Sequence, residues 1–160
     1  NKHKNNSITL VSNRLKNDVK VVFSGRKEPL SDKVYNTMKE LENQTKDCKK
    51  GVFNVCLNYG GQSEIVDACK KITNMVINKE IDLDSINTET FYKYLYNDLP
   101  PIDLLIRTSG EKRLSNFLPW QLSYSEFVFS PKYWPEYSNS DLIESIQIYQ
   151  KRTRRFGGNK

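Results

Sequence analysis

The chain has 160 residues, of which 37% are apolar and 28% are charged, and its formal net charge is +6. This length suits one domain with a sizeable core, and no apolar run approaches the ~18 residues that a membrane-spanning helix needs. The positive charge is compatible with nucleic acid, membrane headgroups or phosphorylated small molecules as partners, and equally with a solvated lysine-rich surface.

Strands and helices alternate from the first apolar segment onward. A strand is predicted at VKVVFSG from Val19, and a helix follows Pro29 with Ser31 as its N-cap. A second strand is predicted at FNVCLNYGG from Phe53, and a helix follows Gly60. The apolar positions of these two helices recur at three- and four-residue steps: Val34, Met38, Leu41, Thr45 and Cys48, then Ile65, Ala68, Ile72 and Met75 or Val76.

The second half of the chain continues the alternation. A short helical pattern includes Phe91, and a third strand, IDLLIRTSG, begins at Ile102. A short strand, EFVFS, begins at Glu126 and is expected at an edge of the sheet or late in it. The last helical pattern contains Leu142, Ile143, Ile146 and Tyr149 and leads into KRTRRFGG.

This order predicts an α/β fold, one domain over residues 1–160 with a mostly parallel sheet covered by helices. The second and third strands are almost continuously apolar, as is typical of strands buried on both faces. Residues 1–18 are expected to be flexible or a trimmed segment. Ligands of such sheets bind at the carboxyl ends of the strands, and the loop RTSGEKRLSNF, residues 107–117, lies at one such end.

Cations and hydroxyls crowd this loop. Arg107 and Arg113 flank a glycine-containing turn, and Thr108, Ser109 and Ser115 supply hydroxyl groups. A guanidinium fits phosphate oxygens with two donors, so the loop has the composition of a diphosphate cradle. A surface loop whose arginines pair with Glu111 and nearby acids explains the residues equally well.

Glu126 and the C-terminal tail likewise allow both a ligand-binding and a purely structural interpretation. Glu126 is an acid among apolar neighbours, where it would suit Mg²⁺ beside a diphosphate or lie exposed at a strand end. The tail KRTRRFGG is either a disordered basic terminus or a turn at Gly157 and Gly158 that approaches phosphate.

Several familiar sites can be excluded from the sequence. The chain has one histidine, His3, so neither a zinc cluster nor a Ser-His-Asp or Cys-His catalytic set is expected. It has no dinucleotide-binding glycine fingerprint and no Walker loop. The three cysteines have no CxxC spacing, and we expect them to be reduced in a cytosol-like compartment.

The segment DLLIRTSGEKRLSNFLPWQLSYSEFVFSPKYWPEY closely resembles the signature block of the cis-prenyltransferases, the undecaprenyl and dehydrodolichyl diphosphate synthases. FNVCLNYGGQSEIVDA resembles a second block of that family, RRFGG resembles a third, and VKVVFSGR fits the family's order. The resemblance therefore covers almost the whole chain from about Val19 onward.

The resemblance implies a dimeric, Mg²⁺-dependent transferase that adds isopentenyl diphosphate units to an allylic diphosphate such as farnesyl diphosphate. The product would be a long-chain cis-polyprenyl diphosphate for dolichol or a similar carrier lipid. Arg107, Arg113 and Ser115 would hold the diphosphate of isopentenyl diphosphate, and Glu126 would be a Mg²⁺ ligand. Gly157 and Gly158, with the preceding arginines, would reach the neighbouring subunit's site. The resemblance assigns Trp120 and Tyr124 a structural role and Lys112 none.

One part of the family pattern is missing from these 160 residues. The family's first strand, catalytic Asp and glycine-rich phosphate loop have no counterpart here. The catalytic residues are therefore expected upstream, and the chain is expected to match the C-terminal two-thirds of a family member. We expect these residues alone to transfer no prenyl group.

Two other interpretations compete with this one. A non-catalytic partner subunit of a heteromeric enzyme would share the fold but typically loses the site residues, which are retained here. A basic nucleic-acid-binding domain is the remote alternative, and no motif for it is present, so no nucleic acid partner is expected. A homodimer is expected, with a heterodimer left open, in the cytoplasm or peripherally at the endoplasmic reticulum membrane. An organellar location is not excluded.

Overall fold

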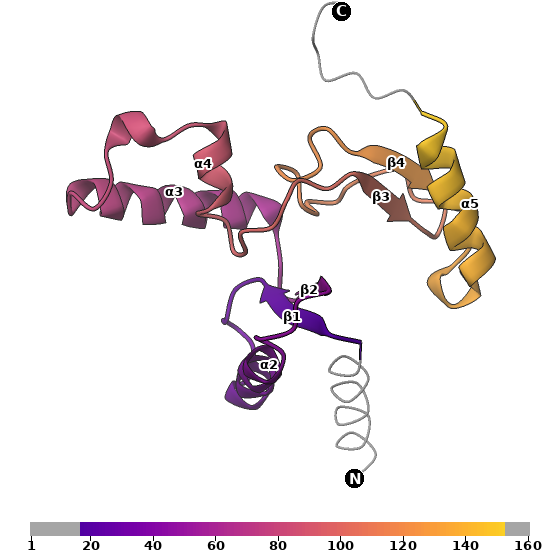
Figure 1. Ribbon diagram of the computed structural model, residues 1–160, viewed down its shortest axis with the longest axis horizontal. Helices are drawn as coiled ribbons and strands as arrows, with labels where there is room; N and C mark the ends of the chain where they lie inside the picture. Colours follow the sequence, from indigo (N-terminus) through magenta and orange to yellow (C-terminus); the bar gives the residue numbers. More distant parts are fainter. Residues whose placement is uncertain (1–16, 153–160) are drawn as a thin grey trace, which may run out of the picture. The chain divides into compact units, whose positions relative to one another are not determined.

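The computed structural model describes residues 17–152, which form two compact units that divide after Asp98 (Figure 1). Each unit contains a pair of parallel strands with helices, so the α/β composition predicted from the sequence is present in both. The assignment of the whole chain to one domain stays a prediction.

The first unit is built on strands β1 (Val19–Ser24) and β2 (Gly51–Cys56), which pair in parallel from Val19 opposite Gly51 to Ser24 opposite Cys56. Helix α2 (Asp32–Gln44) makes the crossover between them. It begins where predicted, because the side chain of Ser31 accepts a hydrogen bond from the backbone N–H of Val34 at 3.4 Å. The predicted strand–helix–strand unit is therefore confirmed.

The end of α2 is fixed to β1 by Thr45, whose side chain is fully buried. Its hydroxyl donates to the carbonyl of Leu41 at 2.9 Å and accepts from the backbone N–H of Val21 at 3.0 Å. Both hydrogen-bonding roles of the hydroxyl are satisfied, so its burial carries no desolvation penalty for an orphaned group.

Helices α3 (Gly61–Ile77) and α4 (Thr88–Tyr92) follow, with the 3₁₀ turns η1 (Leu83–Ser85) between them. Asn87 caps α4 by accepting from the backbone N–H of Thr90 at 2.9 Å, and the hydroxyl of Thr90 accepts from the N–H of Asn87 at 2.8 Å. The buried apolar side chains of this unit are Val21, Ala68, Ile72, Phe91 and Leu95.

The turns after β1 and β2 pack closely against each other at Gly25. This residue has φ +145°, and a Cβ added to it would lie 1.9 Å from the carbonyl oxygen of Leu57. The backbone N–H of Arg26 donates to the carbonyl of Asn58 at 3.2 Å, and the side-chain amide of Asn58 donates to the carbonyl of Arg26 at 2.8 Å. Only glycine fits this contact between two turns.

An ion pair joins the turn after β1 to α3. The guanidinium of Arg26 donates to both carboxylate oxygens of Asp67, at 2.8 and 2.7 Å, and the hydroxyl of Tyr96 donates to Asp67 at 2.6 Å. The hydrogen bond from Arg26, followed by that from Tyr96, lowers the pKa of Asp67 from 3.8 to about 2. Burial, with the nearby Asp67 carboxylate, raises the pKa of Tyr96 to about 12.

This ion pair predicts a contribution to stability that depends on acid pH. A carboxylate with a lowered pKa stabilises the fold above its unfolded pKa near 3.8, and this stabilisation is lost as pH falls toward about 2. We expect Asp67→Asn to reduce the free energy of unfolding at neutral pH by about 1 kcal/mol. It should also flatten the loss of stability between about pH 4 and pH 2, measured by urea unfolding at a series of pH values.

The exposed Asp47 provides the matched control, because Asp47→Asn removes the same charge from a loop of the same unit. Its acid unfolding profile is expected to follow that of the wild type. If Asp67→Asn and Asp47→Asn gave the same profile, the Arg26–Asp67 pair would have no part in acid sensitivity.

The second unit is built on β3 (Leu104–Arg107) and β4 (Glu126–Phe129), which pair in parallel from Leu104 opposite Glu126 to Arg107 opposite Phe129. The 3₁₀ turn η2 (Trp134–Glu136) and helix α5 (Asn139–Gln150) complete it. Its buried apolar side chains are Leu118, Leu122 and Val128. The core thus lies between the strands and the loop that connects them.

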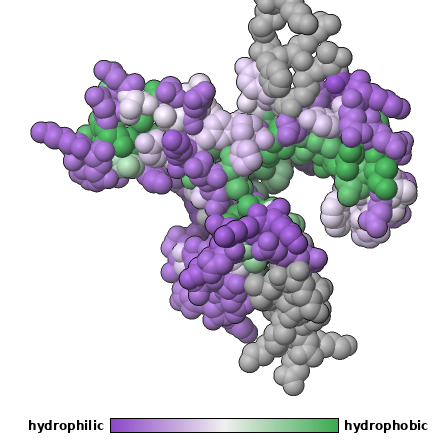
Figure 2. All heavy atoms as spheres, viewed as in Figure 1, coloured by the Kyte–Doolittle hydropathy of each residue, from purple (hydrophilic) through white to green (hydrophobic). Residues whose placement is uncertain are grey.

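Helix α5 is anchored by polar contacts. Ser138 caps its first turn, and the hydroxyl of Tyr137 lies 2.7 Å from that of Ser145, the buried residue of the helix. Apolar side chains of α5 remain at the surface, and Figure 2 shows them in green in the part that carries β3, β4 and α5. These exposed residues are Leu142, Ile143, Ile146 and Ile148.

Both strands that were expected to be buried on both faces differ from this prediction, since all four residues of β3 are of intermediate exposure and β2 is more exposed still. The apolar run of β2 predicted burial on both faces, but Val52 is 50% exposed and Phe53 is 41% exposed. The reason is that β2 has a single neighbouring strand, β1, among residues 17–152. In the same described range, no helix has the length and apolar character needed to cross a membrane.

Candidate functional site

The loop RTSGEKRLSNF begins at the carboxyl end of β3, as its sequence predicts. Arg107 is the last residue of the strand, and its carbonyl accepts from the backbone N–H of Ser130 at 2.8 Å. The backbone N–H of Ser109 donates to the carbonyl of Lys132 at 2.7 Å, and that of Gly110 donates to the carbonyl of Ser130 at 2.9 Å. These bonds hold the loop against the segment that follows β4, so the carboxyl ends of both strands meet here.

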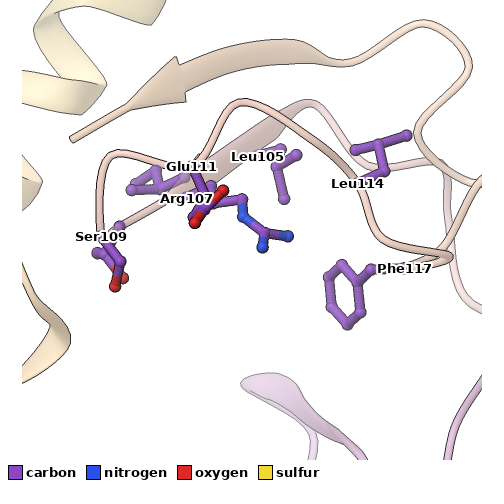
Figure 3. Close-up of a pocket in the computed structure, with 8 residues that line it drawn as sticks. Leu105, Arg107, Ser109, Glu111, Leu114 and Phe117 are labelled. Carbon is purple, nitrogen blue, oxygen red and sulfur yellow. The ribbon is translucent and has the colours of Figure 1, made fainter. Parts of the chain in front are cut away.

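A cavity of about 420 Å³ opens at this end of β3. In Figure 3, Ser109 and Glu111 lie at one end of it and Leu114 and Phe117 at the other, with the guanidinium of Arg107 between them. The remaining lining residues are Leu105, Ile106 and Thr108. The cavity therefore has a polar part with one guanidinium, one carboxylate and two hydroxyl groups beside an apolar part, a composition typical of sites for small amphiphilic ligands.

Arg113 is held by an acid of its own loop. Its guanidinium lies 2.5 Å from the carboxylate of Glu111, and its side chain is 64% exposed. The sequence left open whether the loop arginines bind an anion or pair with Glu111, and in this structure Arg113 makes the pair. Since an exposed ion pair of this kind contributes only ~0–1 kcal/mol, a doubly charged anion could displace Glu111.

The backbone of the loop is strained at several residues that carry side chains. Positive φ angles occur at Ser109, Ser115, Asn116 and Leu118, at 68°, 49°, 65° and 48°. Each such residue costs on the order of 1 kcal/mol or more, and such residues cluster where a structure must present particular groups. Leu118 is buried at 7% exposure, so its packing in the core holds the loop in this conformation.

Glu126, the predicted metal ligand, is the first residue of β4 and pairs with the beginning of the C-terminal tail. Its carboxylate accepts from the guanidinium of Arg152 at 2.7 Å, and the two side chains are 25% and 40% exposed. The sequence offered a metal ligand or an exposed strand end, and the structure gives a half-buried carboxylate that already has a cationic partner.

The predicted site residues are brought together only in part. Arg107 lines the cavity, whereas Arg113 and Ser115 lie in the same loop but not among its lining residues, and both are exposed. Gly157 and Gly158 lie outside the described residues. Among residues 17–152, no three His, Cys, Asp or Glu side chains are grouped closely enough to hold a metal ion by themselves.

Two features of the structure were not singled out from the sequence. Leu114 and Phe117 line the cavity from within a polar loop, and two apolar side chains among so many polar ones are a usable sequence signal. In the first unit, Glu64 is 2% exposed. It accepts from the hydroxyl of Tyr59 at 2.5 Å and from the backbone N–H of Tyr96 at 3.0 Å. This acid forms a buried polar centre at the start of α3.

Comparison with protein families gives one extended match. Residues 3–157 match the family described as putative undecaprenyl diphosphate synthase. The chain is 46% identical over 143 residues to a tritrans,polycis-undecaprenyl-diphosphate synthase, geranylgeranyl-diphosphate specific, from Picrophilus torridus. That match covers 89% of this chain and 56% of the relative.

A second relative is named for a different substrate specificity. The chain is 42% identical over 151 residues to a ditrans,polycis-undecaprenyl-diphosphate synthase, (2E,6E)-farnesyl-diphosphate specific, from Micrococcus luteus, covering 94% of this chain and 61% of the relative. The chain thus spans a little over half the length of these curated relatives.

A solved structure is similar in fold. Lavandulyl diphosphate synthase from Lavandula x intermedia, crystallised with dimethylallyl diphosphate, superposes with a TM-score of 0.82 at 34% identity. The match covers 88% of this chain and 61% of that one. This likeness confirms the predicted α/β fold class.

Proposed function

Because the chain belongs to the undecaprenyl diphosphate synthase family, the cis-prenyltransferases, we propose that the intact protein adds isopentenyl diphosphate to an allylic diphosphate. The product is a long-chain cis-polyprenyl diphosphate, a precursor of dolichol or a similar carrier lipid. The observation that supports this most is the guanidinium of Arg107 in the cavity at the end of β3, within the loop that also carries Arg113 and Ser115.

These three residues act on the donor substrate. Arg107 binds one phosphate from within the cavity, and Arg113 leaves Glu111 to bind the other with its planar fork of donors. The hydroxyl of Ser115 donates a further hydrogen bond. Charge neutralisation and fixed orientation of the donor bring its double bond toward the allylic carbon, and these contributions are the main ones that a protein can make to this reaction.

Glu126 is proposed as a ligand of Mg²⁺. A carboxylate oxygen is the donor that Mg²⁺ prefers, and one or two carboxylates suffice where substrate phosphates supply the other ligands. Among residues 17–152 no three such side chains are grouped, so phosphate oxygens would have to complete the ligand set. When bound, Mg²⁺ would neutralise diphosphate charge.

The ion pair of Glu126 predicts competition between Arg152 and the metal. We expect Arg152→Ala to tighten binding of Mg²⁺ or Mn²⁺ to the full-length protein by roughly two- to fivefold, because a partly exposed ion pair contributes up to ~1 kcal/mol. Calorimetric titration with MnCl₂ measures this, with Lys151→Ala as the neighbouring control. Unchanged or weaker binding in Arg152→Ala would contradict the proposed competition.

We further propose that Gly157 and Gly158 help to enclose the donor diphosphate in the neighbouring subunit of a homodimer. A heterodimer is the alternative assembly. We expect the catalytic residues that act on the allylic diphosphate to lie upstream of these 160 residues, and the 160 residues alone to transfer no prenyl group.

The test is incorporation of radiolabelled isopentenyl diphosphate by the full-length protein with MgCl₂ and farnesyl or geranylgeranyl diphosphate. Labelled, solvent-extractable products that lengthen with time are expected. Absence of incorporation with either allylic substrate would overturn the catalytic proposal and favour a non-catalytic partner subunit, which reconstitution with a catalytic subunit would then identify.

A further inference from the structure

The polar end of the cavity at β3 depends on residues 130–132, which do not line it. The backbone N–H of Ser109 donates to the carbonyl of Lys132 at 2.7 Å, and that of Gly110 donates to the carbonyl of Ser130 at 2.9 Å. Ser109 and Gly110 both have φ +68°, a conformation that costs a serine free energy and persists where surrounding contacts hold it. The place of Ser109 at the polar end of the cavity (Figure 3) is therefore set by where Lys132 lies.

Lys132 is in turn fixed at both ends. Its backbone N–H donates to the hydroxyl of Ser130 at 3.3 Å, and its ammonium donates to one carboxylate oxygen of Asp141, in the first turn of α5, at 2.6 Å. Pro131 has a fixed φ, so the segment between Ser130 and Lys132 has little freedom of its own. Through Lys132, the loop is thus connected to helix α5, which lies beside β4 (Figure 1).

Asp141 is a rigid anchor for this connection. Its other carboxylate oxygen accepts from the backbone N–H of Ser138 at 2.8 Å and from the hydroxyl of Ser138 at 2.6 Å, and its side chain is 15% exposed. The hydrogen bond from Lys132, followed by those from Ser138, holds the pKa of Asp141 well below its usual range. The carboxylate is therefore charged at neutral pH, and Ser138 holds it in place independently of Lys132.

We propose that the Lys132–Asp141 pair positions the loop backbone at residues 107–110 for the donor diphosphate. Asp141 is a positioning residue that acts through Lys132, and neither side chain touches the substrate. This rests on the proposed function, which places the diphosphate at Arg107. A role through charge alone predicts the opposite effect for Asp141, because an acid near an anion site weakens binding and its removal strengthens binding.

Asp141→Asn separates positioning from this effect of charge. The amide has one oxygen where the carboxylate has two, so it can accept from Ser138 or from Lys132 but not from both. In the full-length protein, we expect Asp141→Asn and Lys132→Met each to weaken binding of isopentenyl diphosphate roughly two- to fivefold, the range for a partly exposed ion pair. Calorimetric titration measures this. Unchanged or tighter binding in Asp141→Asn overturns the inference.

Hydrogen exchange followed by mass spectrometry gives a readout that is independent of binding. Both variants should exchange faster than the wild type in the peptide of residues 107–117 and at the wild-type rate in the peptide of residues 139–150. Faster exchange in the second peptide would mean that the substitutions loosen α5 as a whole, and an unchanged first peptide would mean that the pair does not hold the loop. Either result overturns the inference.

Two further variants make the result specific. Lys132→Arg keeps a cation of similar reach and should bind isopentenyl diphosphate as the wild type does. Lys39→Met is the matched control, because the Lys39–Glu42 pair, at 2.8 Å, has a similar exposure in the first unit and should affect neither binding nor exchange at the loop.

The double variant distinguishes the possible failures. Lys132→Met combined with Asp141→Asn should weaken binding no more than either change alone, because both remove the same contact. If the two losses multiply, the residues act separately, and the inference is wrong while the donor site stands. If the wild-type protein does not bind isopentenyl diphosphate, the proposed function fails and the inference fails with it.

Discussion

Replacing Arg113 with alanine is expected to weaken binding of isopentenyl diphosphate by about ten- to a hundredfold in the full-length enzyme. A charge-assisted hydrogen bond contributes on the order of 1.5–3 kcal/mol, and each 1.4 kcal/mol is a factor of ten. The loss should appear in the KM for isopentenyl diphosphate and in direct calorimetric titration, with little effect on the KM for the allylic substrate.

Two neighbouring changes serve as controls. Lys112→Ala removes a cation from the adjacent position, which the family resemblance leaves without a role, and should change the affinity less than twofold. Arg113→Lys keeps the charge but loses the planar fork, so an intermediate loss is expected. If Arg113→Ala left turnover and apparent affinity unchanged, the assignment of Arg113 to the donor diphosphate would be wrong.

Gly25→Ala is expected to destabilise the first unit by about 3 kcal/mol or more, or to prevent its folding. The added Cβ would lie 1.9 Å from the carbonyl oxygen of Leu57, which is backbone and cannot rotate away as a side chain would. The φ of +145° is also one that alanine does not adopt. Urea unfolding followed by circular dichroism measures the effect, and a stability within 1 kcal/mol of the wild type would contradict this account.

Substitutions at two other glycines distinguish the destabilisation caused by a close contact from that caused by backbone strain. Gly51 has nothing within 4 Å of an added Cβ, so Gly51→Ala should be nearly neutral. Gly110 also has open space but φ +68°, so Gly110→Ala should cost on the order of 1 kcal/mol from backbone strain alone. The expected order of stability is therefore Gly51→Ala, Gly110→Ala, Gly25→Ala, from highest to lowest.

Most of the elements could be predicted from the sequence because their signals are local. The strand at Val19 and the helix capped by Ser31 depend on apolar periodicity and one hydroxyl, and both lie where expected. The short helix α4 contains Phe91 as its pattern predicts, and the capping box of Asn87 sets where it begins. The exposure of β2 was not predictable, since it depends on how many strands neighbour it.

The candidate site, too, was predictable from the sequence only in part. The place of Arg107 at a strand end follows from chain order alone, and so it was predictable. The pairing of Glu126 with Arg152 joins residues that lie 26 positions apart, and no periodic pattern connects them. The orientation of Phe117 depends on left-handed backbone at Asn116 and Leu118; asparagine adopts this conformation readily, but leucine does so only when packing requires it.

The two-stranded sheets have a consequence for handling the protein. Among residues 17–152, β2 has one strand partner, so it presents a backbone edge that could pair with another chain, whereas the outer edge of β1 is bonded to the side chains of Thr45, Glu42 and Asn97. The exposed side chains of Val52 and Phe53 also give β2 apolar surface that favours association with another chain. Samples of this 160-residue chain are therefore expected to aggregate through strand addition as concentration rises, and charged or proline substitutions in β2 offer a way to keep them monodisperse.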